Sequence, residues 1–326
     1  MPKVSIIMPT YNGARFIGDA IKSALSQTFQ DFEIIVTDDG STDNTGEIVK
    51  NYAEKDKRIR YYSRTRNGVA AAYNFCIKEA RGIYISIFEH DDISMPERLE
   101  KQIEILDAHK EISILYSSLQ TFNSYGSLGD IYAPYTKSAM SQKECFRALV
   151  TYGSFPNNPS VTIRKEVYEH IRYDERLENY GLGHDFLFYL QASQKFNFYY
   201  LNTPLVLWRR SPNSLSEKSL DNFKASEAVI KRLYLNKQQI FGITYRQALS
   251  MTYIRHARLA INSVQFSNKY LIYLFYNIKA FLNNPFNLAV YKTIIWMFTK
   301  RIRRKYSRQH ELKRTSQQIS LLKAEQ

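Results

Sequence analysis

Apolar residues in the first part of the chain follow two different periods in turn. Continuous apolar runs, typical of strands buried on both faces, alternate with segments in which apolar residues recur every three or four positions, as on a helix with one buried face. Because the connecting segments are short, this alternation predicts a parallel sheet covered by helices. The predicted strands are residues 3–9, 32–36, 58–62 and 83–88, and the predicted helices are 16–25, 42–52 and 69–80.

The pattern changes character further along the chain. A helix is expected near Pro96, with Ser94 and Glu97 at the spacing of a capping box. From Glu217 onward the chain has long helical segments without strands. We therefore expect an α/β domain first and a helical region after it. Further strands are predicted at 113–116, 120–125, 160–164, 198–201 and 205–209, and further helices at 141–151 and from His184.

The predicted strand 83–88 ends in a cluster of acidic residues. Three carboxylates follow within four residues, in the order Glu89, His90, Asp91 and Asp92. Open α/β sheets bind their ligands at the carboxyl ends of strands, and Glu89 and Asp91 can share one hard divalent cation through oxygen ligands. The alternative is a solvated acidic turn that only caps the next helix. An acidic cluster of this kind at the end of a core strand favours the metal site.

The basic charge of the protein is concentrated in its last third. The chain of 326 residues carries a formal net charge of +14. Residues 217–326 hold 20 Lys and Arg against 5 Asp and Glu, whereas residues 1–216 hold 25 against 26. This asymmetry indicates a partner with a negative surface, either anionic lipid or nucleic acid.

Cysteine content and the lengths of apolar segments indicate the cellular compartment of the protein. The two cysteines, Cys76 and Cys145, have no CxxC spacing and predict neither a disulfide framework nor a zinc site, in keeping with a reducing cytosol. The N-terminus begins directly in a strand-like run and lacks the pattern of a signal peptide. No window reaches about 18 uncharged apolar residues, so a transmembrane span is not expected.

Two apolar segments near the C-terminus lead into a basic cluster. An Asn-Asn-Pro break separates residues 270–282 from 286–302, and the second segment contains Trp296 and runs into the basic residues 300–305. Such a helix is typical of a membrane interface; the alternative is a helix packed on the protein or in a dimer, with a solvated tail. We expect residues 270–308 to contact an anionic membrane surface. The expected location is cytoplasmic, at the inner face of the cell membrane.

Several motifs occur in the order of a known family. They are VSIIMPTYN (Val4–Asn12), TDDGSTDNT (Thr37–Thr45), MPERLEKQ (Met95–Gln102), GHD (Gly183–Asp185) and WRRSPNSLS (Trp208–Ser216). Together with the acidic strand end they resemble the inverting family 2 glycosyltransferases, which have a GT-A fold. Each motif alone is weak, but their order and spacing make the match specific. The resemblance covers roughly residues 3–216.

This resemblance implies a fold and an activity. The fold is a GT-A, Rossmann-like α/β architecture with a mostly parallel central sheet and helices on both faces, followed by a helical C-terminal extension. The implied enzyme moves a sugar from a nucleotide-diphosphate sugar, a UDP-sugar being favoured, to a hydroxyl of a saccharide or lipid-linked glycan in polysaccharide biosynthesis. A Mg or Mn ion assists. Residues 1–216 would be the catalytic domain and residues 217–326 a basic, helical, membrane-associating region.

The resemblance also implies roles for individual residues. The donor-binding residues are Pro9, Tyr11, Asp39, Arg66, Gly68 and Asp91. The first three line the nucleoside pocket, where Asp39 accepts a hydrogen bond from the base. Glu89 and Asp91 reach the metal ion, and Asp185 is the general base. For Asp185 the alternative is an ordinary charge at the start of a helix.

Three positions depart from the family pattern. Glu89 replaces the usual Asp and is one methylene longer, so either the metal sits differently or Asp91 is its main ligand. His184 replaces the acidic residue before the base. Ser211 stands where many members have His, which leaves one of the two preceding arginines to supply positive charge to the phosphates. Because none of these changes removes the base or the second metal ligand, we expect an active enzyme.

Other functions compete with this one. A catalytically inactive nucleotide- or sugar-binding relative would keep the fold and lose activity through Glu89 and Ser211. A sugar nucleotidyltransferase needs a Gly-rich basic loop after the first strand, and residues 10–15, TYNGAR, are a poor version of it. A nucleic-acid-binding protein would use the basic C-terminal region. The neutral residues 1–216, with their acidic loops, argue against that role, so no nucleic acid is expected as a partner.

Overall fold

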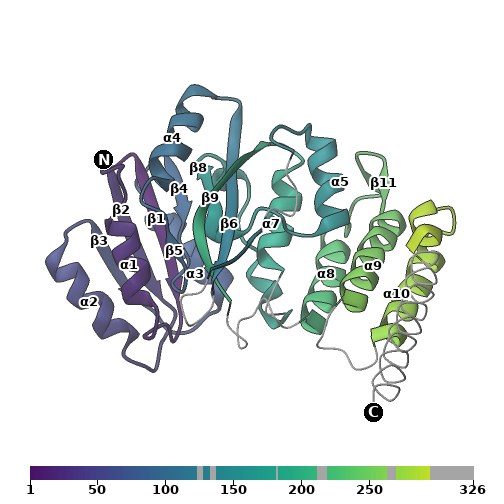
Figure 1. Ribbon diagram of the computed structural model, residues 1–326, viewed down its shortest axis with the longest axis horizontal. Coiled ribbons are helices and arrows are strands. Elements are labelled where there is room, and N and C mark those ends of the chain that lie inside the picture. The colour runs from purple at the N-terminus through teal and green to yellow at the C-terminus, as the bar shows by residue number, and fades with distance from the viewer. Residues whose placement is uncertain (123–127, 133–136, 181–182, 211–218, 263–268, 294–326) are drawn as a thin grey trace, which may run out of the picture. The chain divides into compact units, whose positions relative to one another are not determined.

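The structure is a computed structural model that describes residues 1–122, 128–132, 137–180, 183–210, 219–262 and 269–293 (Figure 1). The chain divides into two compact units, Met1–Gly242 and Ile243–Gln326. The first unit extends past residue 216 and includes helix α8 (Ser219–Leu233). A catalytic domain that ends at residue 216 remains a prediction.

The first half of the sheet is parallel and brings its strand ends to one edge. Strand β1 (Val4–Thr10) pairs in parallel with β2 (Phe32–Asp38) on one side and with β4 (Tyr84–Ile87) on the other, and β2 pairs with β3 (Ile59–Ser63). The strand order β3-β2-β1-β4 therefore reverses its direction between β1 and β4. Open α/β sheets bind ligands beyond the carboxyl ends of strands at such a reversal.

The second half of the sheet is mixed. Strand β8 (Val161–Arg164) lies antiparallel between β4 and β6 (Ile112–Phe122), and β9 (Asn197–Arg209) runs parallel to β6. The sequence predicted two short strands in place of each of β6 and β9, but each is continuous. The register between them shifts near Pro204, because proline has no N–H to donate. The remaining strands of this sheet are β5 (Ile93–Ser94) and β7 (Leu128–Tyr132).

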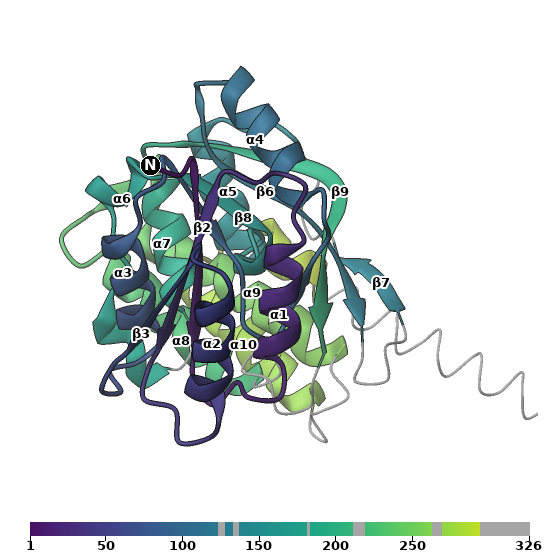
Figure 2. The ribbon, with the colours of Figure 1, turned by 90° about the vertical axis from the view of Figure 1, so that its left-hand side faces the viewer.

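Helices cover both faces of the parallel half, as predicted (Figures 1 and 2). Helices α1 (Ile17–Leu25), α2 (Thr45–Lys55) and α4 (Arg98–Ala108) contribute to one apolar core with the sheet, and α3 (Val69–Glu79) packs against β1 and β2 from the opposite face. Alternate strand residues face opposite sides. The core under α1, α2 and α4 includes Val4, Ile6, Met8, Ile34, Val36, Ile17, Ile21, Val49, Leu99 and Ile103.

The rest of the first unit is mostly helical and packs around α7. Helix α7 begins at His184, as the sequence predicted, and contacts α5 and α8. Helix α5 begins with a capping box formed by Ser141 and Glu144. These elements are α5 (Gln142–Tyr152), the short η1 (Asn158–Ser160), α6 (Val167–His170), the short η2 (Glu175–Tyr180), α7 (His184–Ala192), α8 (Ser219–Leu233) and the two-residue strand β10 (Gln239–Ile240).

The helix after the acidic cluster does not begin as predicted. Ser94 lies in β5, and α4 begins at Arg98 without a side-chain cap. The Ser94 hydroxyl instead accepts a hydrogen bond from Arg98 Nη1 at 2.9 Å. The predicted capping box of Ser94 and Glu97 is therefore wrong, because a buried guanidinium takes the hydroxyl that would have capped the helix.

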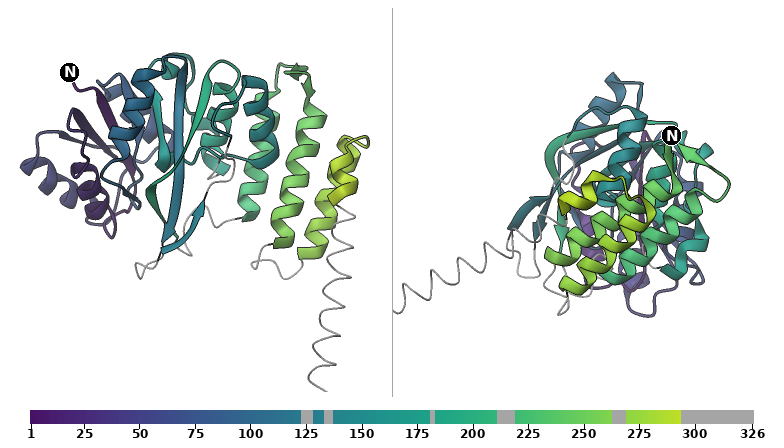
Figure 3. Two further views of the ribbon diagram at one scale, coloured as in Figure 1. Left: turned by 45° about the horizontal axis from the view of Figure 1, so that its top comes forward. Right: turned by 90° about the vertical axis from the view of Figure 1, so that its right-hand side faces the viewer.

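The second unit contains strand β11 (Ile243–Thr244) and two long helices, α9 (Tyr245–Asn262) and α10 (Lys269–Asn283). The helices lie side by side (Figure 3). Helix α10 confirms the helix predicted at 270–282, whereas Trp296 and the basic residues 300–305 lie outside the described residues. Within the part of the chain that the structure describes, every helix is too short or too polar to cross a bilayer.

Candidate active site

Two residues of the predicted donor pocket contact each other at the carboxyl edge of the sheet. Tyr11 follows β1 and Arg66 follows β3. Arg66 Nη1 donates a hydrogen bond of 2.8 Å to the Tyr11 hydroxyl, and its guanidinium lies 4.1 Å from the centre of the Tyr11 ring. Arg66 is exposed, so this stacked pair offers a flat, positively charged surface at the edge of the sheet.

Asp39 ties together the loops that follow β1, β2 and β3. Its carboxylate is buried and accepts the backbone N–H groups of Asn67 at 3.0 Å and Gly68 at 2.7 Å. Its own N–H donates to the carbonyl of Thr10 at 2.9 Å. Gly68 has φ of 90°, a conformation that glycine adopts without strain. Each carboxylate oxygen keeps a second lone pair that can accept a hydrogen bond from a ligand.

Pro9 is buried in the sheet, and Gly40 allows the loops after β2 and β3 to approach each other closely. Pro9 lies opposite Thr37 near the end of the parallel ladder between β1 and β2, and both are buried. Gly40 has φ of 78°, and a Cβ at this position would lie 3.0 Å from the backbone nitrogen of Arg66. A larger residue at Gly40 would therefore push away the loop that carries Arg66.

Glu89, the first predicted metal ligand, is the end of a buried chain of hydrogen bonds. The Tyr73 hydroxyl of α3 donates to Glu89 Oε1. Asn158 Nδ2 donates to the same hydroxyl at 3.2 Å, and the Tyr189 hydroxyl of α7 donates to Asn158 Oδ1 at 2.7 Å. Tyr73, Asn158 and Tyr189 are buried. This chain of hydrogen bonds holds Glu89 in one orientation.

Asp185 belongs to the same electrostatic cluster as the two predicted metal ligands. The pKa of Glu89 is raised to about 7, chiefly by burial and also by the negative charges of Asp91 and Asp185, while the hydrogen bond from Tyr73 and the charge of Arg98 oppose this shift. The first turn of α7 therefore brings Asp185 close to an acidic pair nearly a hundred residues earlier in the chain. The structure brings together Glu89, Asp91 and Asp185.

The first turn of α7, which carries Asp185, begins where Gly183 packs closely against α8. Gly183 has φ of 125°, and a Cβ there would lie 3.1 Å from Val229 of α8. Asp185 Oδ1 accepts the N–H of Phe186 at 2.7 Å. The ring of His184, which replaces an acidic residue of the family pattern, packs 5.7 Å from Tyr73. His184 thus forms part of an aromatic wall behind the carboxylates.

Asp92 and Arg209 fix the acidic loop to the end of β9. The carboxylate of Asp92 is buried and accepts the N–H of Arg209 at 2.8 Å, and Arg209 Nε donates to the carbonyl of Asp91 at 2.8 Å. Burial, and then the charge of Asp91, raise the pKa of Asp92 well above its usual range. Asp92 is therefore a positioning group for the loop. Ser211, the third departure from the family pattern, lies outside the described residues.

Arg98 is a fully buried cation beneath the acidic loop. Its Nη2 donates to the carbonyl of Ile87 at 2.8 Å, and its guanidinium lies 4.2 Å from the centre of the Phe88 ring. Burial lowers the pKa of Arg98 to about 9, and the charges of Asp92 and Glu89 oppose that shift. A buried positive charge beside several carboxylates offsets part of their repulsion.

The acidic pair can supply part of a metal site. Among the described residues, no group of three or more His, Cys, Asp and Glu side chains is arranged to hold a metal ion. Glu89 and Asp91 offer oxygen donors from two residues. Two carboxylates suit Mg²⁺ or Mn²⁺ when water and a substrate diphosphate provide the remaining ligands. The residues present therefore fit a metal that arrives with its substrate.

Replacing Tyr73 by Phe should weaken the support of Glu89 from behind. Tyr73→Phe removes one donor to Glu89 and one acceptor of Asn158 in a buried place, and such groups cost about 1–3 kcal/mol when left unpaired. We expect the free energy of unfolding in urea to fall by that amount. Tyr52→Phe, whose hydroxyl forms no hydrogen bond with a described residue, is the control and should change stability by less than about 0.5 kcal/mol. Equal stability of both variants would contradict the network.

The fold and the site define a class of protein. A sheet whose order reverses between β1 and β4, with the predicted donor-binding side chains on the loops at its carboxyl edge, is the arrangement of nucleotide-binding α/β enzymes. The family model of Glycosyl transferase family 2 matches residues 5–184, which are more than half of the chain. The protein belongs to this family.

Two curated relatives show how far the similarity extends. An uncharacterized glycosyltransferase of Methanocaldococcus jannaschii is 34% identical over 180 residues, which cover 54% of this chain and 60% of the relative. The chondroitin synthase of Pasteurella multocida is 29% identical over 247 residues, 75% of this chain and 24% of the synthase. The chain thus spans less than two thirds of the length of each relative.

Solved structures show the same architecture. Residues 1–349 of S. aureus TarS in complex with UDP-GlcNAc superpose with a TM-score of 0.63 at 20% sequence identity, covering 86% of this chain and 81% of that one. A mannosyltransferase from Pyrobaculum calidifontis in complex with GDP-Man and Mn²⁺ gives a TM-score of 0.54 at 15% identity and covers 88% of both chains. The GT-A fold that the sequence motifs implied is confirmed.

Proposed function

We propose that the protein transfers a sugar, with inversion, from a nucleotide-diphosphate sugar to a hydroxyl of a saccharide or lipid-linked glycan. The observation that carries this proposal is that Glu89 and Asp91 follow β4 at the same carboxyl edge of the sheet as Asp39 and the stacked pair of Tyr11 and Arg66, with the charge of Asp185 acting on Glu89. One side of this arrangement suits a nucleoside and its diphosphate, and the other suits an acceptor hydroxyl that must lose a proton.

Asp185 is proposed as the general base. A hydroxyl is a poor nucleophile until a base takes its proton during attack, and a positioned carboxylate can do so. In-line attack by this hydroxyl on the anomeric carbon displaces the diphosphate from the opposite face, which inverts the configuration.

Glu89 and Asp91 are proposed to hold a Mg or Mn ion on the donor diphosphate. Such an ion supplies Lewis-acid stabilisation of the negative charge on the leaving phosphate. The protein's own part is to hold the two carboxylates still, through Tyr73 for Glu89 and through Arg209 and Asp92 for the loop of Asp91. Burial, and after it the negative charges of Asp91 and Asp185, raise the pKa of Glu89, and a cation bound between the carboxylates would offset this repulsion.

A UDP-sugar is proposed as donor and a growing polysaccharide as acceptor. The structural relative TarS has been solved with UDP and with UDP-GlcNAc, and the P. multocida relative is a chondroitin synthase. On the side of the nucleoside, Asp39, Pro9 and Tyr11 are proposed to surround the base and ribose, with Arg66 and Gly68 next to the diphosphate.

Calorimetric titration tests this proposal directly. We expect one of UDP, GDP and dTDP to bind the wild-type protein more tightly with Mn²⁺ or Mg²⁺ than without, and UDP to be that nucleotide. Release of UDP from the matching nucleotide sugar, together with the anomeric configuration of the product by NMR, then tests transfer with inversion. Binding of nucleotide without any turnover would favour the catalytically inactive relative, and binding of none would overturn the proposal.

The second unit is proposed to contact an anionic membrane surface. Helix α10 exposes a row of large apolar side chains to solvent: Leu271, Leu274, Phe275, Ile278, Phe281 and Leu282. An apolar helix face beside a strongly basic chain segment is typical of helices that lie in the headgroup region. This would hold the glycosyltransferase at the inner face of the cell membrane, where lipid-linked acceptors reside.

Polar substitutions on α10 test the membrane contact. The full-length variant Leu274→Gln/Ile278→Gln should bind vesicles of phosphatidylcholine and phosphatidylglycerol several-fold more weakly than wild type in a sedimentation assay, because less apolar area is buried. Ile83→Gln/Leu235→Gln changes two apolar residues of the first unit that are at least as exposed and is the matched control. Equal vesicle binding by the two variants would exclude α10 as the contact.

A further inference from the structure

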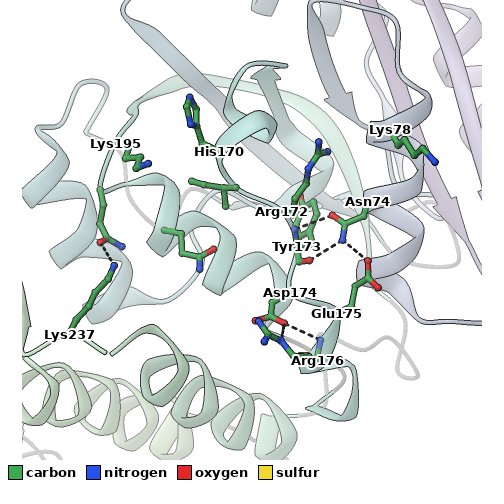
Figure 4. Close-up of a pocket in the computed structure, with 13 residues that line it drawn as sticks. Asn74, Lys78, His170, Arg172, Tyr173, Asp174, Glu175, Arg176, Lys195 and Lys237 are labelled. Atoms are coloured by element: carbon green, nitrogen blue, oxygen red, sulfur yellow. Dashed lines mark hydrogen bonds and ion pairs between the residues drawn. The ribbon is translucent and has the colours of Figure 1, made fainter. Parts of the chain in front are cut away.

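A cavity lies in the first unit, apart from the predicted donor-binding residues. It has a volume of about 770 Å³ and is bounded by α3, the segment after α6, and the C-terminal end of α7 (Figure 4). A volume of this size suits an organic ligand of several rings better than a single ion. None of the residues implied in donor binding lines it; the lining includes Lys78, Arg172, Tyr173, Asp174, Lys195 and Lys237.

The lining of this cavity carries a net positive charge, because its few acidic residues are already paired. The carboxylate of Asp174 accepts hydrogen bonds from Arg176 Nε at 2.8 Å and from Arg232 Nε at 2.9 Å. Glu175, the other acid of the lining, accepts from Asn74 Nδ2 at 2.9 Å.

The cations around the cavity are not neutralised in the same way. Lys78, Arg172 and Lys195 are exposed and form no ion pair with any described residue. Lys237 Nζ donates only to the neutral amide of Gln194, at 3.0 Å. The cavity therefore attracts negative charge from several sides, and separated cations of this kind fit charges that are spread along a ligand.

The cavity and the catalytic cluster share one aromatic wall. Tyr173 lines the cavity, and its ring lies 4.8 Å from that of Tyr73 and 5.8 Å from that of His184. On the other side of this wall the Tyr73 hydroxyl donates to Glu89, and His184 directly precedes Asp185. Tyr73 and Tyr173 are buried, so these rings separate the cavity from the proposed base, and a chain-like acceptor bound in the cavity must pass around them to bring a hydroxyl to Asp185.

We propose that this basic cavity binds the negatively charged groups, phosphate or carboxylate, of the acceptor glycan, so that the enzyme elongates or decorates an anionic polysaccharide. The proposal rests on the proposed function for the identity of the ligand as an acceptor. The cavity itself, its cations and its shared wall do not depend on that function. Charged units of the acceptor would occupy the cavity while a hydroxyl further along the chain reaches Asp185.

Direct binding of a charged oligosaccharide tests this inference. The probe is a hyaluronan hexasaccharide, whose glucuronate units carry carboxylates, and its neutral counterpart is maltohexaose. Arg172→Glu/Lys195→Glu should bind the charged probe at least tenfold more weakly than wild type. Lys55→Glu/Lys143→Glu changes the net charge equally at exposed positions outside the cavity and is the matched control, expected to bind like wild type.

The outcomes separate this inference from its rivals. Tenfold weaker binding confined to the cavity variant, with no binding of maltohexaose, supports the anionic acceptor. Equal loss in both variants would overturn it, because the attraction would then come from net charge alone. If inorganic phosphate at the same concentration displaces the charged probe, the cavity is a site for simple anions and the inference is overturned. Cavity-dependent binding to phosphatidylglycerol vesicles would assign it to lipid headgroups, which also overturns the inference.

A parallel titration with UDP keeps the two proposals apart. The cavity variant should bind UDP as wild type does, which shows an intact fold and a separate donor site. Wild-type protein that binds no nucleotide overturns the proposed function, whatever the hexasaccharide does. Normal nucleotide binding combined with cavity-independent binding of the hexasaccharide overturns only the present inference.

Discussion

Asp185→Asn should lower kcat for sugar transfer by about a hundredfold or more, while the Kd for UDP stays within about threefold of wild type. Removal of a general base costs about 10²–10⁴ in rate. The amide cannot accept the acceptor's proton, yet its Oδ1 can still accept the N–H of Phe186, so that the first turn of α7 should be preserved. Turnover is measured as UDP release with the best acceptor found in a screen of oligosaccharides, and Kd by calorimetry.

A matched variant separates catalysis from stability. Asp19→Asn makes the same chemical change in the first turn of α1, where the carboxylate is exposed and only pairs with Lys22 at 3.8 Å. Its kcat should equal that of wild type, because an exposed pair contributes little. Full activity of Asp185→Asn would mean that another group takes the proton. A matching loss in Asp19→Asn would point to general destabilisation.

Local sequence signals were enough to predict the parallel half of the sheet. The runs that became β1, β2 and β4 are short, apolar and followed by polar loops, so periodicity alone marked them. Because parallel strands align their carboxyl ends, the loops carrying Asp39, Arg66 and Glu89 were expected at one edge. The contact from Asp39 to the N–H of Gly68 bears out that proximity.

Elements that depend on distant residues were not predictable in this way. Strands β6 and β9 support each other along their whole length, so each continues through positions that look like breaks in isolation. Arg98 reads as an exposed helical residue, yet it is buried because the carbonyls of Ile87 and Val161 receive its guanidinium. That burial also removed the predicted capping box, since Ser94 serves the arginine instead.

The residues that support Glu89 from behind were equally difficult to predict from the sequence. Tyr73 lies on α3 and Asn158 on η1, and neither belongs to a recognisable motif. Their importance depends on a hydrogen-bond chain that joins α3, η1 and α7 behind Glu89. The only sequence signal that could have suggested it is the position of polar side chains in otherwise apolar segments, and such residues are common in ordinary cores.

Asp91→Ala should remove the metal-dependent part of UDP binding, so that the Kd becomes the same with Mn²⁺ and with EDTA. Of the two acids, Glu89 is the weaker ligand, because its Oε1 already accepts from Tyr73 and burial raises its pKa to about 7, which leaves it partly protonated near neutrality. Asp91 should then provide the main protein oxygen. In wild type we expect Mn²⁺ to tighten UDP binding at least tenfold.

The choice between the two acids follows from comparing matched variants. Asp31→Ala removes an exposed carboxylate just before β2, at the opposite edge of the sheet, and should keep the full effect of Mn²⁺. Glu89→Gln should keep part of it, since the amide oxygen can still bind a cation weakly. The reverse order, with Glu89→Gln losing the effect and Asp91→Ala keeping it, would make the longer side chain the main ligand. If wild type is indifferent to Mn²⁺ and Mg²⁺, the diphosphate is instead held by cationic side chains, and Arg66→Ala should then weaken UDP binding.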